Sequence, residues 1–215
     1  MLYYNYFYAE LLALASCMYA YRKLDSNFKI FLPFLAFVVI YEFANIYNLL
    51  LWHHTNVWSV NFEEIVELAV YGRFMASLDK RKTYRNKVYI TIAAGIIISL
   101  IDVFFIQGFW SLGTIAIVLK NTILAVLVCI YYYNLLNNAD DYPDLLGFPP
   151  FLATMGLLLY SLANFFYFAF FDYLVRKNNY VFLKLAQVIP QIGCILIYLL
   201  LSISFLCFLR TKKLS

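Results

Sequence analysis

Seven segments of the chain are almost continuously apolar, and each is bounded by charged or turn-forming residues. These segments cover residues 2–21, 30–50, 57–78, 88–106, 112–136, 150–172 and 180–209. A helix needs about 20 apolar residues to cross a bilayer, and each segment is near that length. The pattern therefore predicts an all-α membrane protein, a bundle of seven transmembrane helices joined by short connections.

Composition supports the same class. Of the 215 residues, 65% are hydrophobic, 20% aromatic and only 13% charged, whereas a soluble domain has about 25% charged residues. The segments leave little sequence between them, so we expect one membrane domain over residues 1–215 and no soluble domain. This excludes kinase, nucleotide-binding and nucleic-acid-binding folds. The first segment has no basic residue before it and no small-residue cleavage site after it, so we expect it to be retained as a span.

Basic residues are concentrated in alternate connections. Eleven of them follow the first, third and seventh segments, and only Arg176 and Lys177 lie in the other connections. The eleven are Arg22, Lys23, Lys29, Lys80, Arg81, Lys82, Arg85, Lys87, Arg210, Lys212 and Lys213. Because cytoplasmic loops are enriched in Lys and Arg, this predicts an outer N-terminus and a cytoplasmic C-terminus. The fifth connection carries acidic residues instead, which count little in this rule.

A weak internal similarity relates the second and sixth segments. The sequence Pro-Phe-Leu-Ala occurs at 33–36 and again at 150–153, and Tyr-x-x-Ala-Asn occurs at 41–45 and 160–164. Both segments would run from the cytoplasm outwards, so the similarity suggests a parallel 3+1+3 repeat of the kind found in transporters. Chance similarity in so apolar a chain is the alternative.

Polar residues inside the apolar segments are the main functional evidence, because a charge in hydrocarbon costs on the order of 3 kcal/mol. At about 1.5 Å per residue, Glu10, Glu42 and Lys120 lie about 12 Å from the outer end, with the other acidic residues at nearby depths. The predicted ligand or ion chamber consists of Glu10, Glu42, Glu63, Glu67, Asp102, Lys120, Asn45, Asn164, Gln187 and Gln191. We expect Lys120 to pair with Glu67 or Glu63, and unpaired deep carboxyl groups to hold a proton. The alternative is that these groups only join helices by hydrogen bonds.

The sequence argues against an enzyme. Its only histidines are the adjacent pair His53 and His54, whereas a catalytic zinc site uses three protein ligands, usually histidines. No paired cysteines are present for thiol redox chemistry, and no histidine lies near a candidate serine nucleophile. We therefore predict no catalytic residue, no metal site and no cofactor. Pro190, in the middle of the last segment, is expected to kink that helix.

Three resemblances bear on the architecture. Seven spans with an outer N-terminus resemble rhodopsins, receptors and seven-helix transporters, although no lysine lies deep in the last segment where microbial rhodopsins bind retinal. The single Pro190-Gln191 is similar to the dipeptide of the PQ-loop transporters, but it stands in the seventh segment instead of the first and fifth. The sequences at 104–109 and 159–168 resemble small uncharacterised seven-span proteins of Bacteroidetes bacteria, which implies the same architecture and a bacterial inner membrane.

Two functional hypotheses of different class follow, and the first is slightly favoured. In the first, the chain is a sensory or accessory module whose outer chamber takes a small ligand or a proton and whose basic cytoplasmic loop signals to a separate protein. The contact residues would be Lys80, Arg81, Lys82, Arg85 and Lys87. In the second, the chain is a small proton-coupled or cation/solute transporter. A membrane accessory or effector of a prokaryotic defence system is a third hypothesis. A homo-oligomer is also open, with no stoichiometry indicated.

Overall fold

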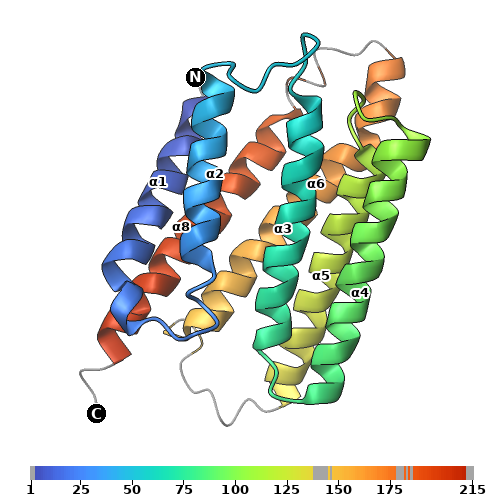
Figure 1. The fold of residues 1–215 in the computed structure, drawn as a ribbon. Coiled ribbons are helices and arrows are strands. Elements are labelled where there is room, and N and C mark those ends of the chain that lie inside the picture. The colour runs from blue at the N-terminus through green and yellow to red at the C-terminus, as the bar shows by residue number, and fades with distance from the viewer. Residues whose placement is uncertain are drawn as a thin grey trace.

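The part of the chain that the computed structural model describes is all-helical (Figure 1). It comprises residues 3–137, 145, 147–177, 182, 184 and 186–211, and it contains no β-strand. The α-helices in this part are α1 (Tyr3–Ala20), α2 (Phe31–Ile46), α3 (Val57–Ser77), α4 (Lys82–Ile101), α5 (Thr114–Asn137), α6 (Pro149–Arg176) and α8 (Val188–Thr211). A 3₁₀ turn, Tyr21–Lys23, follows α1, and a π-helical turn, Asp102–Ile106, continues α4.

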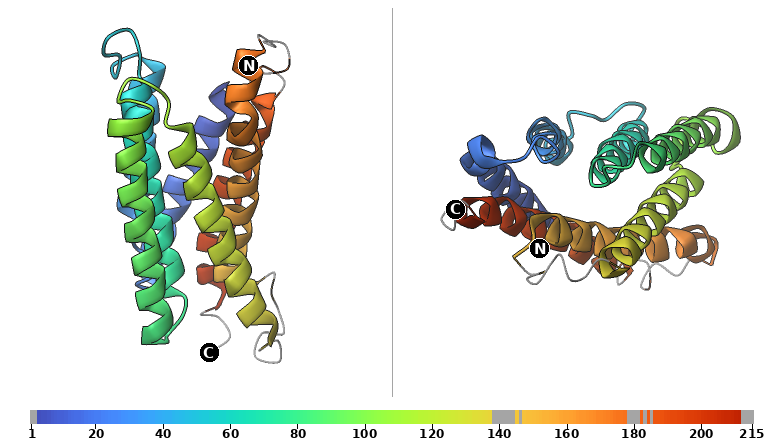
Figure 2. Two further views of the ribbon diagram at one scale, coloured as in Figure 1. Left: turned by 90° about the vertical axis from the view of Figure 1, so that its right-hand side faces the viewer. Right: turned by 90° about the horizontal axis from the view of Figure 1, so that it is seen from below.

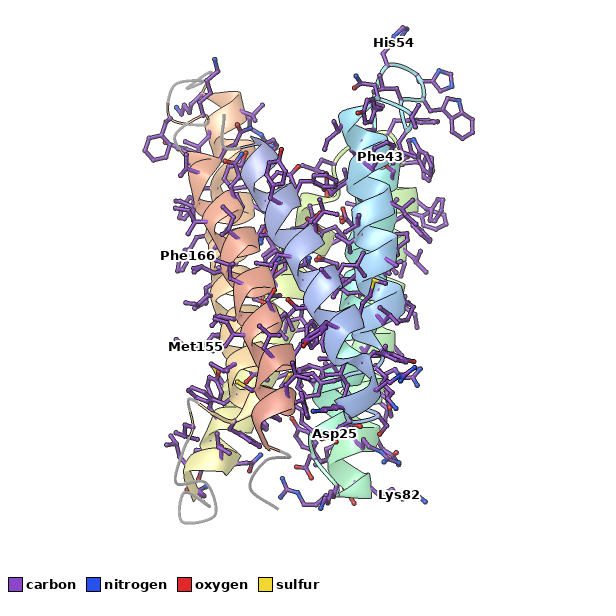
Figure 3. All side chains as sticks on the ribbon, turned by 90° about the vertical axis from the view of Figure 1, so that its left-hand side faces the viewer. Asp25, Phe43, His54, Lys82, Met155 and Phe166 are labelled. Carbon is purple, nitrogen blue, oxygen red and sulfur yellow. The ribbon has the colours of Figure 1, made fainter. Side chains whose placement is uncertain are left out.

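Consecutive helices run in opposite directions, so α1 begins at the end of the bundle opposite to the end of α8 (Figure 1). We call these two ends the N-terminal end and the C-terminal end of the bundle. The connections 47–56 and 107–113 lie at the N-terminal end. The connections 24–30 and 78–81 lie at the C-terminal end, where Asp25 and Lys82 are also found (Figure 3).

Four of the helical segments are long and apolar enough to cross a membrane, which supports the predicted membrane protein. They are Lys82–Ile106, Thr114–Asn137, Pro149–Arg176 and Val188–Leu209, and α2 is a shorter apolar helix. Large apolar side chains cover their outer surfaces: Phe105 is 84% exposed and Ile90 70% exposed. Phe166 and Met155 on α6 likewise point away from the bundle (Figure 3). Such surfaces suit contact with lipid chains.

The helices form two rows, visible when the bundle is viewed along its axis (Figure 2, right). One row contains α2, α3 and α4, and the other contains α8 and α6. Helix α1 closes one side by packing against α2 and α8, and α5 closes the other side by packing against α3, α4 and α6. The two rows are therefore bridged on one side by α1 and on the other by α5.

Small residues let α6 and α8 approach closely. A Cβ atom on Gly193 would lie 2.8 Å from the Cβ of Ala163, and one on Gly156 would lie 3.1 Å from the Cα of Ile197. Close backbone approach at small residues is typical of helix packing in membranes. Helices α2 and α3 have no comparable extended contact, so the helix pairing in the first three helices differs from that in the last three. The internal repeat stays a prediction.

Aromatic side chains join the two rows near the C-terminal end. This aromatic core consists of Phe28, Phe31, Phe34, Tyr71, Phe74, Phe205 and Phe208, all of which are buried. Phe31 of α2 has its ring centroid 4.9 Å from that of Phe74 on α3 and 6.0 Å from that of Phe205 on α8. Tilted and edge-to-face contacts of this kind add to the stability gained from burial alone.

Two local features at the segment ends refine the expectations. The last segment is interrupted at Gln187, a turn between the helical residue Ala186 and the start of α8 at Val188, so Pro190 lies in the first turn of α8, where a missing N–H needs no partner. Helix α4 begins at Lys82, six residues before the apolar segment, because a helix can extend beyond the hydrocarbon with its charged residues in water. Gly108, with φ +93°, makes the tight turn after the π-helical end of α4.

A candidate ligand-binding chamber

A cavity of about 330 Å³ lies between the two helix rows. Five helices contribute to its wall, and five glutamates come from three of them: Glu10 from α1, Glu42 from α2, and Glu63, Glu64 and Glu67 from α3. We call this cavity the acidic chamber. The remaining lining residues, from α1, α6, the turn before α8 and α8, are Tyr6, Tyr160, Asn164, Tyr167, Phe168, Gln187, Pro190, Gln191, Cys194 and Tyr198.

The three glutamates of α3 share the chamber because of their spacing. Residues three and four positions apart lie on one side of a helix, so Glu67 stacks with both Glu63 and Glu64. Glu63 was predicted to line the chamber, and Glu64 was not. In the structure Glu64 is one of the two carboxylates that pair with the lysine.

Lys120 of α5 is the only lysine in contact with the glutamates among the described residues. Its side chain is 1% exposed, and its Nζ lies 2.6 Å from Glu64 Oε2 and also pairs with Glu67 Oε2. Pairing with Glu67 was one of the two predicted alternatives, whereas pairing with Glu63 does not occur. Two carboxylates around one ammonium group offset much of the cost of burying the lysine.

Tyr160 of α6 completes this group. Its hydroxyl donates a 2.7 Å hydrogen bond to Glu67 Oε2 and lies 3.4 Å from Lys120 Nζ, and the ammonium group is 5.2 Å from the ring centroid. We call Lys120, Glu64, Glu67 and Tyr160 the lysine network. It joins α3 of one row, α6 of the other row, and α5, which bridges the two. Sequence reasoning missed Tyr160 as a site residue, although it stands in the second Tyr-x-x-Ala-Asn sequence.

The other three glutamates have no cation beside them in the described part of the chain. Glu10 is only 3% exposed, and its Oε2 atom has no hydrogen-bond partner there. Glu42 accepts a 3.1 Å hydrogen bond from the Tyr6 hydroxyl. Five carboxyl groups thus line the chamber, and the single ammonium group in contact with them, that of Lys120, belongs to a residue outside the chamber wall. Not all five can be ionised at once without large repulsion, so the chamber favours protons or a positively charged occupant.

Amide side chains supply uncharged polar groups to the wall. Asn164, Gln187 and Gln191 all line the acidic chamber, as the sequence predicted for their depth. Asn164 donates a 3.0 Å hydrogen bond from Nδ2 to the Tyr160 carbonyl one turn earlier in α6, which leaves its Oδ1 for other partners. A few placed polar groups of this kind are what small-molecule sites use to fix the orientation of a ligand.

Asp102 and Asn45 do not belong to the chamber, which corrects the predicted set. Asp102 is fully buried at the end of α4, where its Oδ2 accepts the backbone N–H of Ala116 at 3.1 Å, in the first turn of α5. The neighbouring Asn61 accepts the N–H of Gly113 at 2.9 Å. These side chains satisfy donors at the start of α5, as helix caps do.

Asn45 also has a local role. Its Oδ1 accepts a 3.3 Å hydrogen bond from Asn56, across the connection between α2 and α3. Depth along the helix was the basis for including Asp102 and Asn45. The direction in which each side chain leaves its helix separates them from the glutamates, and depth does not contain that information.

The basic residues proposed to contact a partner lie at the opposite end of the bundle. Lys80, Arg81, Lys82, Arg85 and Lys87 are all exposed. Arg81 makes an ion pair of 2.6 Å with Asp79. The hydrogen bonds that the Arg81 side chain donates to the Asp79 carboxylate lower the pKa of that carboxyl. Of the other charged residues of the predicted cytoplasmic side, Asp140, Asp141, Asp144, Lys212 and Lys213 lie outside the described residues.

Among the described residues, no group of three or more His, Cys, Asp and Glu side chains is arranged to hold a metal ion. Comparison with protein-family models, with curated proteins and with solved structures found no match to the chain.

Proposed function

We propose that the chain is a seven-span membrane module whose acidic chamber opens to the outside, binds a small organic cation, and reports that binding to a separate cytoplasmic protein. The observation that carries the proposal is the mismatch of charge in the chamber. Lys120 is paired with Glu64 and Glu67, whereas no cation of the described residues lies beside Glu10, Glu42 and Glu63.

The proposed orientation follows from the distribution of charge between the two ends. The chamber is lined by Tyr6 and Glu10 early in α1 and by Gln187 before α8, so it lies towards the N-terminal end. Lys80 to Lys87 and Arg22 lie at the C-terminal end. With the basic end in the cytoplasm, as the positive-inside rule requires, the chamber faces the exterior.

The chemistry of the ligand follows from the wall. Each uncompensated carboxylate in a low-dielectric cavity is stabilised either by a proton or by a bound cation. Tyr6, Tyr167 and Phe168 add aromatic rings, which attract ammonium groups through their π-faces. Gln187 and Gln191 offer both donors and acceptors to the uncharged part of a ligand. A small amine or quaternary ammonium compound satisfies all three features.

A receptor-like role is supported by the closed inner end of the bundle. Beyond the chamber, the aromatic core joins α2, α3 and α8 by direct ring contacts. Such close packing leaves a ligand no continuous polar route to the cytoplasm in this conformation. Binding between the rows would instead draw α1 and α2 towards α8, and α3 leads directly into the basic loop that we propose as the partner contact.

A proton-coupled or cation transporter is the second candidate, and the arrangement of the rows favours it. The rows are joined mainly through α1 and α5 on either side and through the aromatic core at one end. Two helix groups joined in this way can rock about a central site, which is the motion used for alternating access. The chamber would then be the outward-open half of a transport pathway.

Purified protein in proteoliposomes tests both candidates. We would measure the thermal unfolding midpoint with tetramethylammonium, choline or putrescine, and the internal pH with a trapped dye, for the native chain, Glu67→Gln and Lys120→Met. The receptor proposal expects a cation to raise the midpoint, since a ligand that binds only the folded state stabilises it. It expects no change of internal pH.

Two variants with one acid removed sharpen this test. Glu10→Gln should abolish the rise caused by the cation, whereas Asp102→Asn, an acid outside the chamber, should keep it. Cation-dependent pH changes that are lost in Glu67→Gln or Lys120→Met would establish the transporter instead. A midpoint that no cation raises, in protein shown to be folded, would contradict a cationic ligand.

A further inference from the structure

A second cavity, of about 240 Å³, lies at the C-terminal end of the bundle, far from the acidic chamber along α3. Its wall is formed by the connection 24–30, the end of α3 and the beginning of α4. Arg73 of α3 and Arg85 of α4 both line it. We call this cavity the arginine pocket. None of its lining residues is acidic, so its charge is opposite to that of the chamber.

Arg73 and Arg85 line the same cavity because α3 and α4 are antiparallel neighbours. Arg73 lies one turn before the end of α3, and Arg85 lies in the first turn of α4. Both side chains are exposed, and neither has an ion pair or side-chain hydrogen bond with another described residue. Arg81 differs from them, because its guanidinium group already donates hydrogen bonds to the Asp79 carboxylate.

Residues other than the two arginines fix the shape of the arginine pocket. Asn27 donates a 3.1 Å hydrogen bond to the Ser77 carbonyl and so fixes the connection 24–30 against α3. Phe74, next to Arg73, is 1% exposed and belongs to the aromatic core, which makes the inner wall rigid. Ser26 adds a hydroxyl group, and Tyr89 adds a phenol one turn beyond Arg85.

We propose that the arginine pocket binds the phosphate of an anionic phospholipid headgroup. Guanidinium groups bind phosphate oxygens in pairs with favourable geometry, and two arginines line this cavity with no acidic residue in its wall. The position selects a lipid phosphate over a free one. Arg73 stands inside the apolar segment of α3, and Tyr89, 44% exposed on the lipid-facing surface of α4, continues the pocket towards the hydrocarbon. Placement in the cytoplasmic leaflet rests on the proposed orientation, whereas the pocket itself does not.

Lipid titration of the detergent-purified chain tests the proposal without reference to orientation or to the acidic chamber. The thermal unfolding midpoint is measured in mixed micelles with increasing dioleoylphosphatidylglycerol, and separately with dioleoylphosphatidylcholine or with inorganic phosphate at the same concentration. Phosphatidylglycerol should raise the midpoint at lower concentration than phosphatidylcholine does. Inorganic phosphate should have no such effect, and an equal effect would overturn the assignment to a lipid.

Variants show whether the pocket or the general charge of this end is responsible. A hydrogen bond between charged groups contributes about tenfold in affinity, so Arg73→Gln with Arg85→Gln should weaken phosphatidylglycerol binding by about 100-fold. Arg22→Gln with Lys82→Gln removes the same charge outside the pocket, and in salt that screens exposed charges its binding should weaken less than about tenfold. Equal losses in both pairs would overturn the proposal.

The conservative double variant Arg73→Lys with Arg85→Lys is the control for misfolding. It keeps the charge and removes the forked donors, so we expect an intermediate loss with an unchanged midpoint in phosphatidylcholine. Full retention of binding in this pair would show that charge alone suffices and would contradict a phosphate held by paired guanidinium groups.

Discussion

The two halves of the bundle join helices to α3 by opposite means. Towards the N-terminal end, α3, α5 and α6 meet through the lysine network, in which every contact involves a charged group or a hydroxyl. Towards the C-terminal end, α2, α3 and α8 meet through Phe31, Phe74 and Phe205, which have no polar atoms. Closely packed rings are stable in one arrangement and need no partner ions. A buried group of ions is stable only while its positive and negative charges balance.

This difference indicates which half can change state. The aromatic core has every ring nearly fully buried, so an opening there would lose close contacts in all directions. The acidic chamber contains a cavity and a buried Glu10 oxygen without a partner among the described residues. A proton or a cation alters the balance of charge in the chamber and leaves the aromatic core unchanged. We therefore expect the core to be the fixed part and the chamber the responsive part.

The largest expected effect is the loss of a ring from the fixed part. Phe31→Ala should lower the free energy of unfolding by about 4 kcal/mol, because it leaves a cavity among four aromatic neighbours. Unfolding in detergent, followed by circular dichroism, measures the change. Phe105→Ala removes a ring that is 84% exposed and should have almost no effect. Comparable losses in the two variants would show that the core does not dominate stability.

The second largest expected effect is the loss of the buried cation beside the acidic chamber. Lys120→Met should cost about 3 kcal/mol, because it leaves the buried Glu64 and Glu67 without their cation. Adding Glu64→Gln and Glu67→Gln to Lys120→Met should recover most of this loss, since no unpaired charge remains. The same unfolding measurement applies. A triple variant as unstable as Lys120→Met alone would mean that the lysine acts through packing and not through charge.

The sequence alone predicts the helices well and the site in part. In both cases the prediction rests on the position of a residue along an apolar segment. Apolar length determines where a membrane helix lies, so Thr114–Asn137 and Pro149–Arg176 are close to the predicted 112–136 and 150–172. Depth follows from position along such a helix, which is why Glu10, Glu42, Glu63 and Glu67 are found together in one chamber.

The sequence does not predict the direction in which a side chain leaves its helix, nor the local backbone conformation at the end of a helix. Glu63 and Glu64 differ by one position, yet only Glu64 reaches Lys120, because the partner helix lies on that side. Asp102 has suitable depth, but α4 changes to a π-helical turn there and directs its carboxylate to the start of α5. Both outcomes depend on how α5 packs, which no periodicity within one helix encodes.

A smaller effect compares two tyrosines at matching positions of the similar sequences. Tyr160 donates a 2.7 Å hydrogen bond to the carboxylate of Glu67, whereas the hydroxyl of Tyr41 is 3.5 Å from that of Ser59. Tyr160→Phe should cost about 2 kcal/mol, as expected for a bond to a charged group, and Tyr41→Phe less than about 1 kcal/mol. Equal losses in unfolding free energy would contradict the central place of the lysine network.

The smallest expected effect lies outside both halves, in the basic loop, and it depends on pH. The Arg81 guanidinium lowers the pKa of the Asp79 carboxyl, so the ion pair contributes stability above the ordinary aspartate pKa of about 3.9, and this contribution is lost as pH falls through the lowered value. Because Arg81 is largely exposed, solvent and salt screen the pair. Asp79→Asn should therefore lower the unfolding midpoint only slightly at pH 7, and the two proteins should converge as the pH falls and the Asp79 carboxyl becomes protonated. Thermal scans over a pH series from 7 into the acid range, in low salt, measure the difference. A variant more stable than the native chain at pH 7 would mean that Asp79 is destabilising in its charged form.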